Sequence, residues 1–171
     1  MRTDEVKQRR TKTPEQALAT LMHLCARAEK STGDARRLMR GWGVDGRAQE
    51  EVLRKLIEQR FIDDVRFAEA FVREKVNLSG WGAYKIRAAL ARKGIDRSTI
   101  ERTIAEMDPA QNAERLQMQL ARKMRSVKAA SAYELKTKLM RYGLSLGFDF
   151  ESVSDAVGAM IKNMEDECDI F

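Results

Sequence analysis

This 171-residue chain contains only two prolines, two cysteines and one histidine. The two cysteines, Cys25 and Cys168, are too few for a disulfide framework or a cysteine-rich metal site. His23 alone cannot build a catalytic triad, and we favour a structural role for it. No apolar run approaches the roughly 20 residues that span a bilayer, and residues 1–12 lack the apolar core of a signal peptide. These absences predict a cytoplasmic protein without a membrane segment.

Aromatic residues are also scarce, at 6%, whereas Ala, Leu, Arg, Lys and Glu are abundant. These abundant residues lose little side-chain freedom in a helix, so the composition favours helices. A hydrophobic content of 43% in a chain of this length is sufficient for a real core. We therefore expect an all-α protein.

The charge of the chain is unevenly distributed. The net charge is +6, but eight basic residues and one acid, Glu134, fall between Arg115 and Arg141. From Asp149 to Phe171 the balance reverses, with seven acids and one base. A basic stretch followed by an acidic one suggests a surface for acidic partners. Solvated helix faces are the alternative for any single charge.

Helical segments of similar length recur three times along the chain. In each copy a short basic helix is followed by a glycine and an aliphatic residue: Gly43-Val44, Gly94-Ile95 and Gly143-Leu144, which are 51 and 49 residues apart. Glycine is favoured there because the residue that ends a helix often adopts a left-handed conformation. The pattern predicts three tandem three-helix repeats that form an elongated, curved body. The predicted parts are a flexible basic arm (1–12), repeats at 13–62, 63–108 and 109–164, and an acidic C-terminal tail (165–171).

The second repeat carries the motifs of a known family. Phe61-Ile62-Asp63-Asp64-Val65-Arg66-Phe67-Ala68 resembles the acidic pair followed by Arg-Phe-Ala that is typical of RecX proteins. The glycine-rich stretch that continues as Ile86-Arg87-Ala88-Ala89-Leu90, and the ending Lys93-Gly94-Ile95, are similar to the segments that follow in that family. The first and third repeats match the family more loosely.

The resemblance implies a small modulator without catalytic groups or cofactors. RecX-like proteins bind the RecA protein and its filament on single-stranded DNA, and usually inhibit the recombinase in recombination, DNA repair and the SOS response. We therefore expect a monomeric, non-enzymatic regulator that contacts RecA and, through a basic face, nucleic acid. The alternative is a direct DNA-binding helical-repeat protein without a dedicated RecA partner.

Basic and aromatic residues in the second and third repeats are the candidates for these contacts. Phosphate binding by the basic residues and stacking by the aromatic ones are the functional interpretation, while solvation and packing between repeats are the alternatives. The Asp63-Asp64 pair could suggest a metal site, but we prefer a helix cap. No phosphate-binding loop of the Gly-Lys-Ser type occurs. The candidates are Lys85, Arg87, Arg92, Lys93, Arg122, Lys123, Arg125, Lys128, Trp81 and Tyr84.

Overall fold

The helices begin where capping residues in the sequence allow. The computed structural model describes the backbone of residues 11–168 and the side chains of residues 11–164. Thr13 accepts the backbone N–H of Gln16, whose side chain accepts the N–H of Thr13, so the two residues form a capping box. The helices are α1 (Pro14–Arg27), α2 (Thr32–Gly41), α3 (Gly46–Glu58), α4 (Asp64–Ser79), α5 (Ala83–Arg92), α6 (Arg97–Ala105), α7 (Pro109–Ser126), α8 (Ala132–Ser145) and α9 (Phe150–Cys168).

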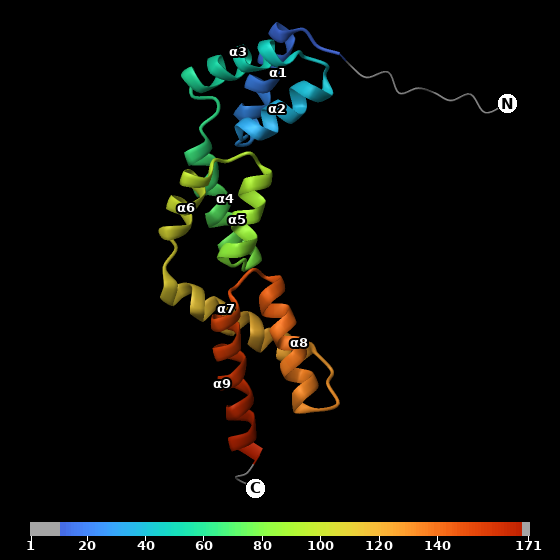
Figure 1. Cartoon of the computed structure of the whole chain (residues 1–171), viewed down its shortest axis with the longest axis vertical. Coiled ribbons are helices and arrows are strands. Elements are labelled where there is room, and N and C mark those ends of the chain that lie inside the picture. The colour runs from blue at the N-terminus through green and yellow to red at the C-terminus, as the bar shows by residue number, and fades with distance from the viewer. Residues whose placement is uncertain (1–10, 169–171) are drawn as a thin grey trace, which may run out of the picture. The chain divides into compact units, whose positions relative to one another are not determined.

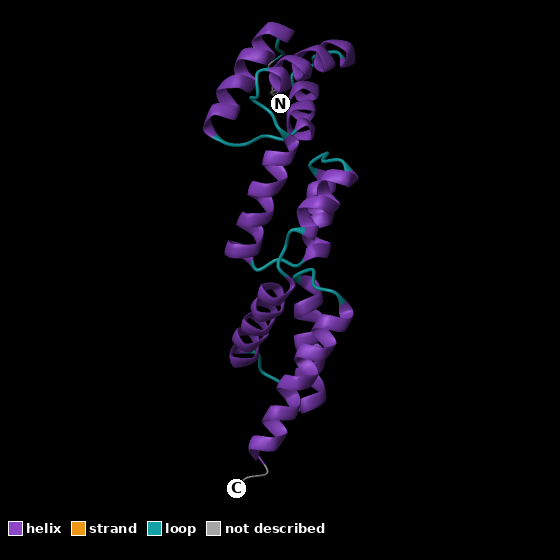
Figure 2. Cartoon of the chain, turned by 90° about the vertical axis from the view of Figure 1, so that its left-hand side faces the viewer, coloured by secondary structure: helices purple, strands orange, loops and turns teal. Residues whose placement is uncertain are grey.

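Figures 1 and 2 show helices and loops, and no strand, between residues 11 and 168. The prediction of an all-α helical-repeat chain is confirmed. The arm at residues 1–10 and the side chains of the acidic tail lie outside the described residues. The exact repeat bounds and the curved shape stay predictions.

The chain forms two compact units. The first unit comprises residues 11–69 together with Ala91–Thr99. Its core gathers apolar side chains from α1, α2 and α3, and Leu21, Met39 and Leu56 are fully buried. Full burial of such a side chain contributes about 1.5–3 kcal/mol relative to leaving it in water.

The second unit comprises Ala70–Leu90 and residues 100–168. Its largest described cluster joins α7, α8 and α9 through Leu120, Leu139, Val153 and Val157, none of which is exposed. Spacings of three and four residues place these side chains on one face of each helix. The three helices therefore share one core.

A glycine in the left-handed region follows the middle helix of each three-helix group. Gly43 has φ +73°, Gly94 has φ +78° and Gly147 has φ +91°. The residue after each glycine is buried, as the cap motif requires. These buried residues are Val44, Ile95 and Phe148.

The prediction that Gly143 and Leu144 close the third copy was wrong. Gly143 lies inside α8, and a Cβ there would come within 2.7 Å of the Val153 side chain, so this glycine lets α8 and α9 approach closely. Leu144 is 41% exposed. Helix α8 continues to Ser145, and the apolar residue that folds back onto the core after it is Phe148 rather than Leu144. The closing glycines are therefore 51 and 53 residues apart.

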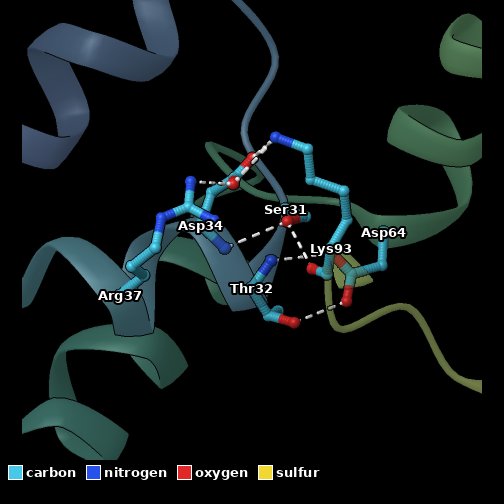
Figure 3. Close-up of polar contacts among 6 residues, drawn as sticks. All are labelled: Ser31, Thr32, Asp34, Arg37, Asp64 and Lys93. Atoms are coloured by element: carbon cyan, nitrogen blue, oxygen red, sulfur yellow. Dashed lines mark hydrogen bonds and ion pairs between the residues drawn. The ribbon is translucent and has the colours of Figure 1, made fainter. Parts of the chain in front are cut away.

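In the first unit, the turn after α5 packs on the start of α2. Figure 3 shows this contact, which we call the first joint. Ser31 donates its hydroxyl to the backbone oxygen of Lys93 at 2.7 Å, and the same hydroxyl accepts the N–H of Asp34. Gly33 lies so close to Lys93 that a Cβ would come within 2.2 Å of its carbonyl oxygen.

The second unit repeats this arrangement with main-chain groups. The N–H of Gly82 donates to the carbonyl of Leu146 at 2.8 Å, and the N–H of Tyr84 donates to that of Gly147 at 3.0 Å. A Cβ at Gly82 would come within 2.4 Å of the Gly147 oxygen. In this second joint, the turn that closes α8 packs on the start of α5.

Candidate nucleic-acid and partner interface

Trp81 lies in the short connection between α4 and α5, in the second unit. Gly80 ends α4 with φ +62°, and Trp81 packs edge-to-face on Phe71 with ring centroids 6.4 Å apart. The ammonium groups of Lys85 and Lys75 lie 4.6 and 5.5 Å from the centroid of the Trp81 ring. Such cation–π contacts hold the indole in place. Trp81 is half-buried, so packing accounts for much of its surface.

Tyr84 and Arg87 extend this group along α5. Tyr84 is 61% exposed, and the guanidinium of Arg87 lies 5.5 Å from its ring centroid. Arg87 donates two hydrogen bonds to Glu101, at 2.7 and 2.9 Å. These bonds raise the pKa of Arg87 above its usual value. The charge of Arg87 is thus already paired, and Tyr84 is the most exposed side chain of the group formed with Trp81 and Arg87.

The first unit contains an equivalent pair. Arg36 donates to both oxygens of Glu50 at 3.0 Å, and the two residues are separated by 14 positions, as Arg87 and Glu101 are. The two ion pairs occupy the same places relative to Gly43 and Gly94. Both therefore connect the second and third helices of a three-helix group.

Lys93 belongs to the first joint. Its ammonium group donates to both carboxylate oxygens of Asp34, at 3.1 and 3.3 Å, and Arg37 donates to Asp34 at 2.6 Å (Figure 3). Burial alone would raise the pKa of Asp34, but the hydrogen bonds and charges of Lys93 and Arg37 outweigh it and lower that pKa. Arg92, next to Lys93, is exposed and has no ion pair with another described residue.

The remaining candidates gather around the loop between α7 and α8. Arg122, Arg125 and Lys128 are exposed and form no ion pair within residues 11–164. Lys123 is half-buried, with its ammonium group 5.3 Å from the centroid of the Tyr142 ring. These four residues lie in the last turns of α7 and in the loop that follows it.

Two residues just beyond this loop, at the start of α8, were absent from the sequence candidates. Tyr133, in the first turn of α8, is 81% exposed, and Lys136 one turn later is exposed as well. A tyrosine within a basic, acid-poor stretch is a signal that the sequence did contain. We call the exposed set the basic tip, and it comprises Arg122, Arg125, Lys128, Tyr133 and Lys136.

The one acid of this stretch is already engaged. Glu134 accepts the ammonium group of Lys138 at 2.7 Å and the backbone N–H of Ala130 at 2.7 Å. These two hydrogen bonds lower the pKa of Glu134. Lys138 also donates to the carbonyl of Lys128 at 2.7 Å, which ties the loop to α8. The basic tip consequently has a fixed loop and no free carboxylate of its own.

Asp63 and Asp64 take separate structural roles. Asp63 accepts the N–H groups of Val65 and Arg66, both at 3.0 Å, and so caps α4 as preferred from the sequence. Asp64 instead accepts the N–H and hydroxyl of Thr32, at 2.9 and 2.7 Å, in the first joint (Figure 3). This long-range role of Asp64 was not predicted.

The described residues contain no group of three or more His, Cys, Asp or Glu side chains that could hold a metal ion. Within the same part of the chain, no helix has both the length and the apolar character needed to cross a membrane.

The three groups of three helices, closed by matching glycine turns, define a tandem helical-repeat protein. The family model described as "RecX, second three-helix domain" matches residues 63–104. A regulatory protein RecX of Halalkalibacterium halodurans is 32% identical over 119 residues, which cover 69% of this chain and 45% of that protein. One of Geobacillus thermodenitrificans is 38% identical over 111 residues, 63% of this chain and 41% of that protein. The chain belongs to the RecX family.

Solved structures agree with this fold. The crystal structure of RecX from Lactobacillus salivarius matches with a TM-score of 0.73 at 18% identity, over 87% of this chain and 96% of that one. This likeness concerns the fold alone. The chain spans about half the length of the curated relatives that it matches.

Proposed function

We propose that the protein is a non-enzymatic regulator that binds RecA and its filament on single-stranded DNA and inhibits the recombinase. Membership of a family of regulatory proteins supports this function, as does the resemblance of residues 61–95 to RecX motifs. The observation that carries it is the group of exposed cations in the basic tip, none of which forms an ion pair with a described residue. Such a protein acts through differential affinity for filament states and needs no reacting group.

The direct test is to add the protein to RecA-catalysed strand exchange and to the DNA-dependent ATPase of RecA. Inhibition that saturates with added protein is expected, and pull-down of RecA should succeed with single-stranded DNA present. Unchanged strand exchange and ATPase activity at several-fold molar excess over filament sites would refute the proposal.

We further propose that the basic tip is the part that contacts nucleic acid. Its cations can neutralise phosphates and release counterions, while Tyr133 offers a ring on which a base can stack. Arg87 and Lys93, by contrast, already pair with Glu101 and Asp34. The same observation favours the second candidate function, a DNA-binding repeat protein that needs no RecA.

The role of the basic tip is tested with the triple variant Arg122→Ala/Arg125→Ala/Lys128→Ala. Removal of each cation that neutralises a phosphate should reduce the slope of log affinity against log salt by about 0.7 for single strands, so the slope of the triple variant should fall by about 2. The matched control removes three exposed arginines that also lack an ion pair with a described residue: Arg47, Arg73 and Arg102. Equal slopes for the two variants would exclude the basic tip as the nucleic-acid contact. Binding of DNA with no effect on RecA would favour the second candidate function.

A further inference from the structure

The second unit contains a small cavity beside Tyr84. It lies between the start of α5, the junction of α6 and α7, and the turn that leads into α9, and its volume is about 240 Å³. Cavities that bind drug-sized molecules measure about 300–1,000 Å³, so this one has room for a single side chain. Its apolar wall includes Ile104, Met107, Leu116 and Phe148.

One polar atom at this cavity lacks a partner. Asn112 of α7 is half-buried and lines the cavity, and its Oδ1 atom is buried without a hydrogen bond to any described residue. Buried side-chain oxygens nearly always accept a hydrogen bond, and one that does not destabilises the fold. The last side-chain torsion of asparagine is broad, so rotation of the amide can turn this oxygen toward the cavity. A ligand that donates an N–H there supplies the missing hydrogen bond.

The charged group of the wall is an acceptor as well. Asp149 accepts the N–H and the hydroxyl of Ser152, at 2.8 and 2.7 Å, and each carboxylate oxygen keeps a further lone pair. These two hydrogen bonds lower the pKa of Asp149, so the carboxylate is ionised at neutral pH. Among the described residues that line the cavity, Asp149 is the one that carries a charge. The cavity is therefore suited to a cation that donates hydrogen bonds.

Tyr84 adds an aromatic ring to the wall. It is 61% exposed, so a ligand can reach the ring from solvent. Arg87 contacts the same ring, but its charge is paired with Glu101. A guanidinium group is planar, carries five N–H donors and no acceptor, and stacks on aromatic rings. The arginine side chain thus matches both the acceptors and the ring.

We propose that this cavity binds an arginine side chain presented by a protein partner. The apolar stem of the arginine packs on Met107 and Phe148, while its guanidinium donates to Asn112 and Asp149 and lies against the ring of Tyr84. A nucleotide fits less well, because the described residues of the wall offer no cation to its phosphate. The inference goes beyond the proposed function, since it depends neither on the basic tip nor on RecA.

Binding is measured by NMR on the whole 171-residue chain, with N-acetyl-arginine methylamide as the probe. The probe should shift the backbone amides of Tyr84 and Ser152 and the side-chain amide of Asn112. The citrulline analogue has nearly the same shape without the charge, and it should bind about tenfold more weakly. Equal binding of the two probes would overturn the inference. Thymidine 5′-monophosphate is the third probe, and tighter binding of this nucleotide at the same amides would assign the cavity to nucleic acid instead.

Two variants remove the acceptors and preserve the fold. Asn112→Leu removes an oxygen that has no partner, and Asp149→Asn keeps a residue that caps helices well. Each should weaken binding of the arginine probe about tenfold. The matched control is Asp155→Asn, which removes one exposed acid of α9 outside the cavity wall. Unchanged binding by both acceptor variants, or an equal loss for Asp149→Asn and Asp155→Asn, would contradict the assignment of the cavity.

Discussion

Substitution of Gly33 by alanine should destabilise the first joint and leave the remaining helix contacts unchanged. The added Cβ would lie 2.2 Å from the carbonyl oxygen and 2.7 Å from the carbonyl carbon of Lys93, and 3.0 Å from the Cα of Gly94. All three atoms are backbone, so no flexible side chain can move aside. The turn must withdraw by on the order of 1 Å to restore ordinary contact.

The cost follows from what that movement breaks. The Ser31–Lys93 hydrogen bond, at 2.7 Å, and the Lys93–Asp34 ion pair both depend on the position of the turn. Overpacking typically costs 1–3 kcal/mol and the loss of a hydrogen bond about 1 kcal/mol. Alanine regains at most about 1 kcal/mol through its helix propensity. We expect Gly33→Ala to destabilise the first unit by about 2–3 kcal/mol.

The matched control is Gly41→Ala at the other end of the same helix. No atom lies within 4 Å of a Cβ at Gly41, so this variant should be between neutral and about 1 kcal/mol more stable. Urea unfolding measures both variants, and hydrogen exchange of the amides from Thr32 to Asp34 localises the effect. If Gly33→Ala unfolds at the same urea concentration as Gly41→Ala, the close approach seen at the first joint does not stabilise the protein.

Three further outcomes are expected. Arg60 follows α3 and is the one described non-glycine residue with positive φ (58°). Arg60→Gly should therefore raise the free energy of unfolding by about 0.5–1 kcal/mol in urea titrations. A decrease would mean that the contacts of the Arg60 side chain stabilise the protein more than its backbone strain destabilises it. The folded chain lowers the pKa of Asp34, so its ionised form stabilises the fold above the unfolded pKa of about 4, and that contribution disappears as the pH falls through the lower folded pKa. Asp34→Asn should therefore be less stable at neutral pH and lose less stability in acid; parallel pH profiles would contradict this. Tyr133→Ala should weaken oligodeoxythymidine binding by about 1–3 kcal/mol in fluorescence titrations with little change in salt dependence. Phe150→Ala is the control at an exposed aromatic residue that is not a candidate contact.

Local signals in the sequence predicted most of the fold. The helix cap at Asp63 and the closing glycines at 43 and 94 depend on neighbouring residues, and the structure confirms each of them. The third copy was misread because two glycines, Gly143 and Gly147, lie within five residues of each other. Choosing between them requires knowing which apolar residue reaches the core, and that depends on α9.

The candidate site was harder to predict for the same reason. Arg87 and Lys93 resemble free cations in the sequence, yet their partners lie 14 and 59 positions away. Alignment of the repeats offered one clue, because Arg36 and Glu50 recur as Arg87 and Glu101 at the same spacing. The partner of Lys93 gave no such clue, since Asp34 lies in another repeat.

The second joint holds together mainly through carbonyls and amides of the main chain, with the Lys85 ammonium group as a side-chain donor to the Ser145 carbonyl, and this has a consequence for sequence change. The first joint employs six particular side chains, so most substitutions there carry a structural penalty. At the second joint, a Cβ at position 82 or 147 would clash with neighbouring atoms, so both positions require glycine. The ring of Tyr84, by contrast, is exposed to solvent. That position can therefore diverge to suit a different binding partner without loosening the attachment beneath it.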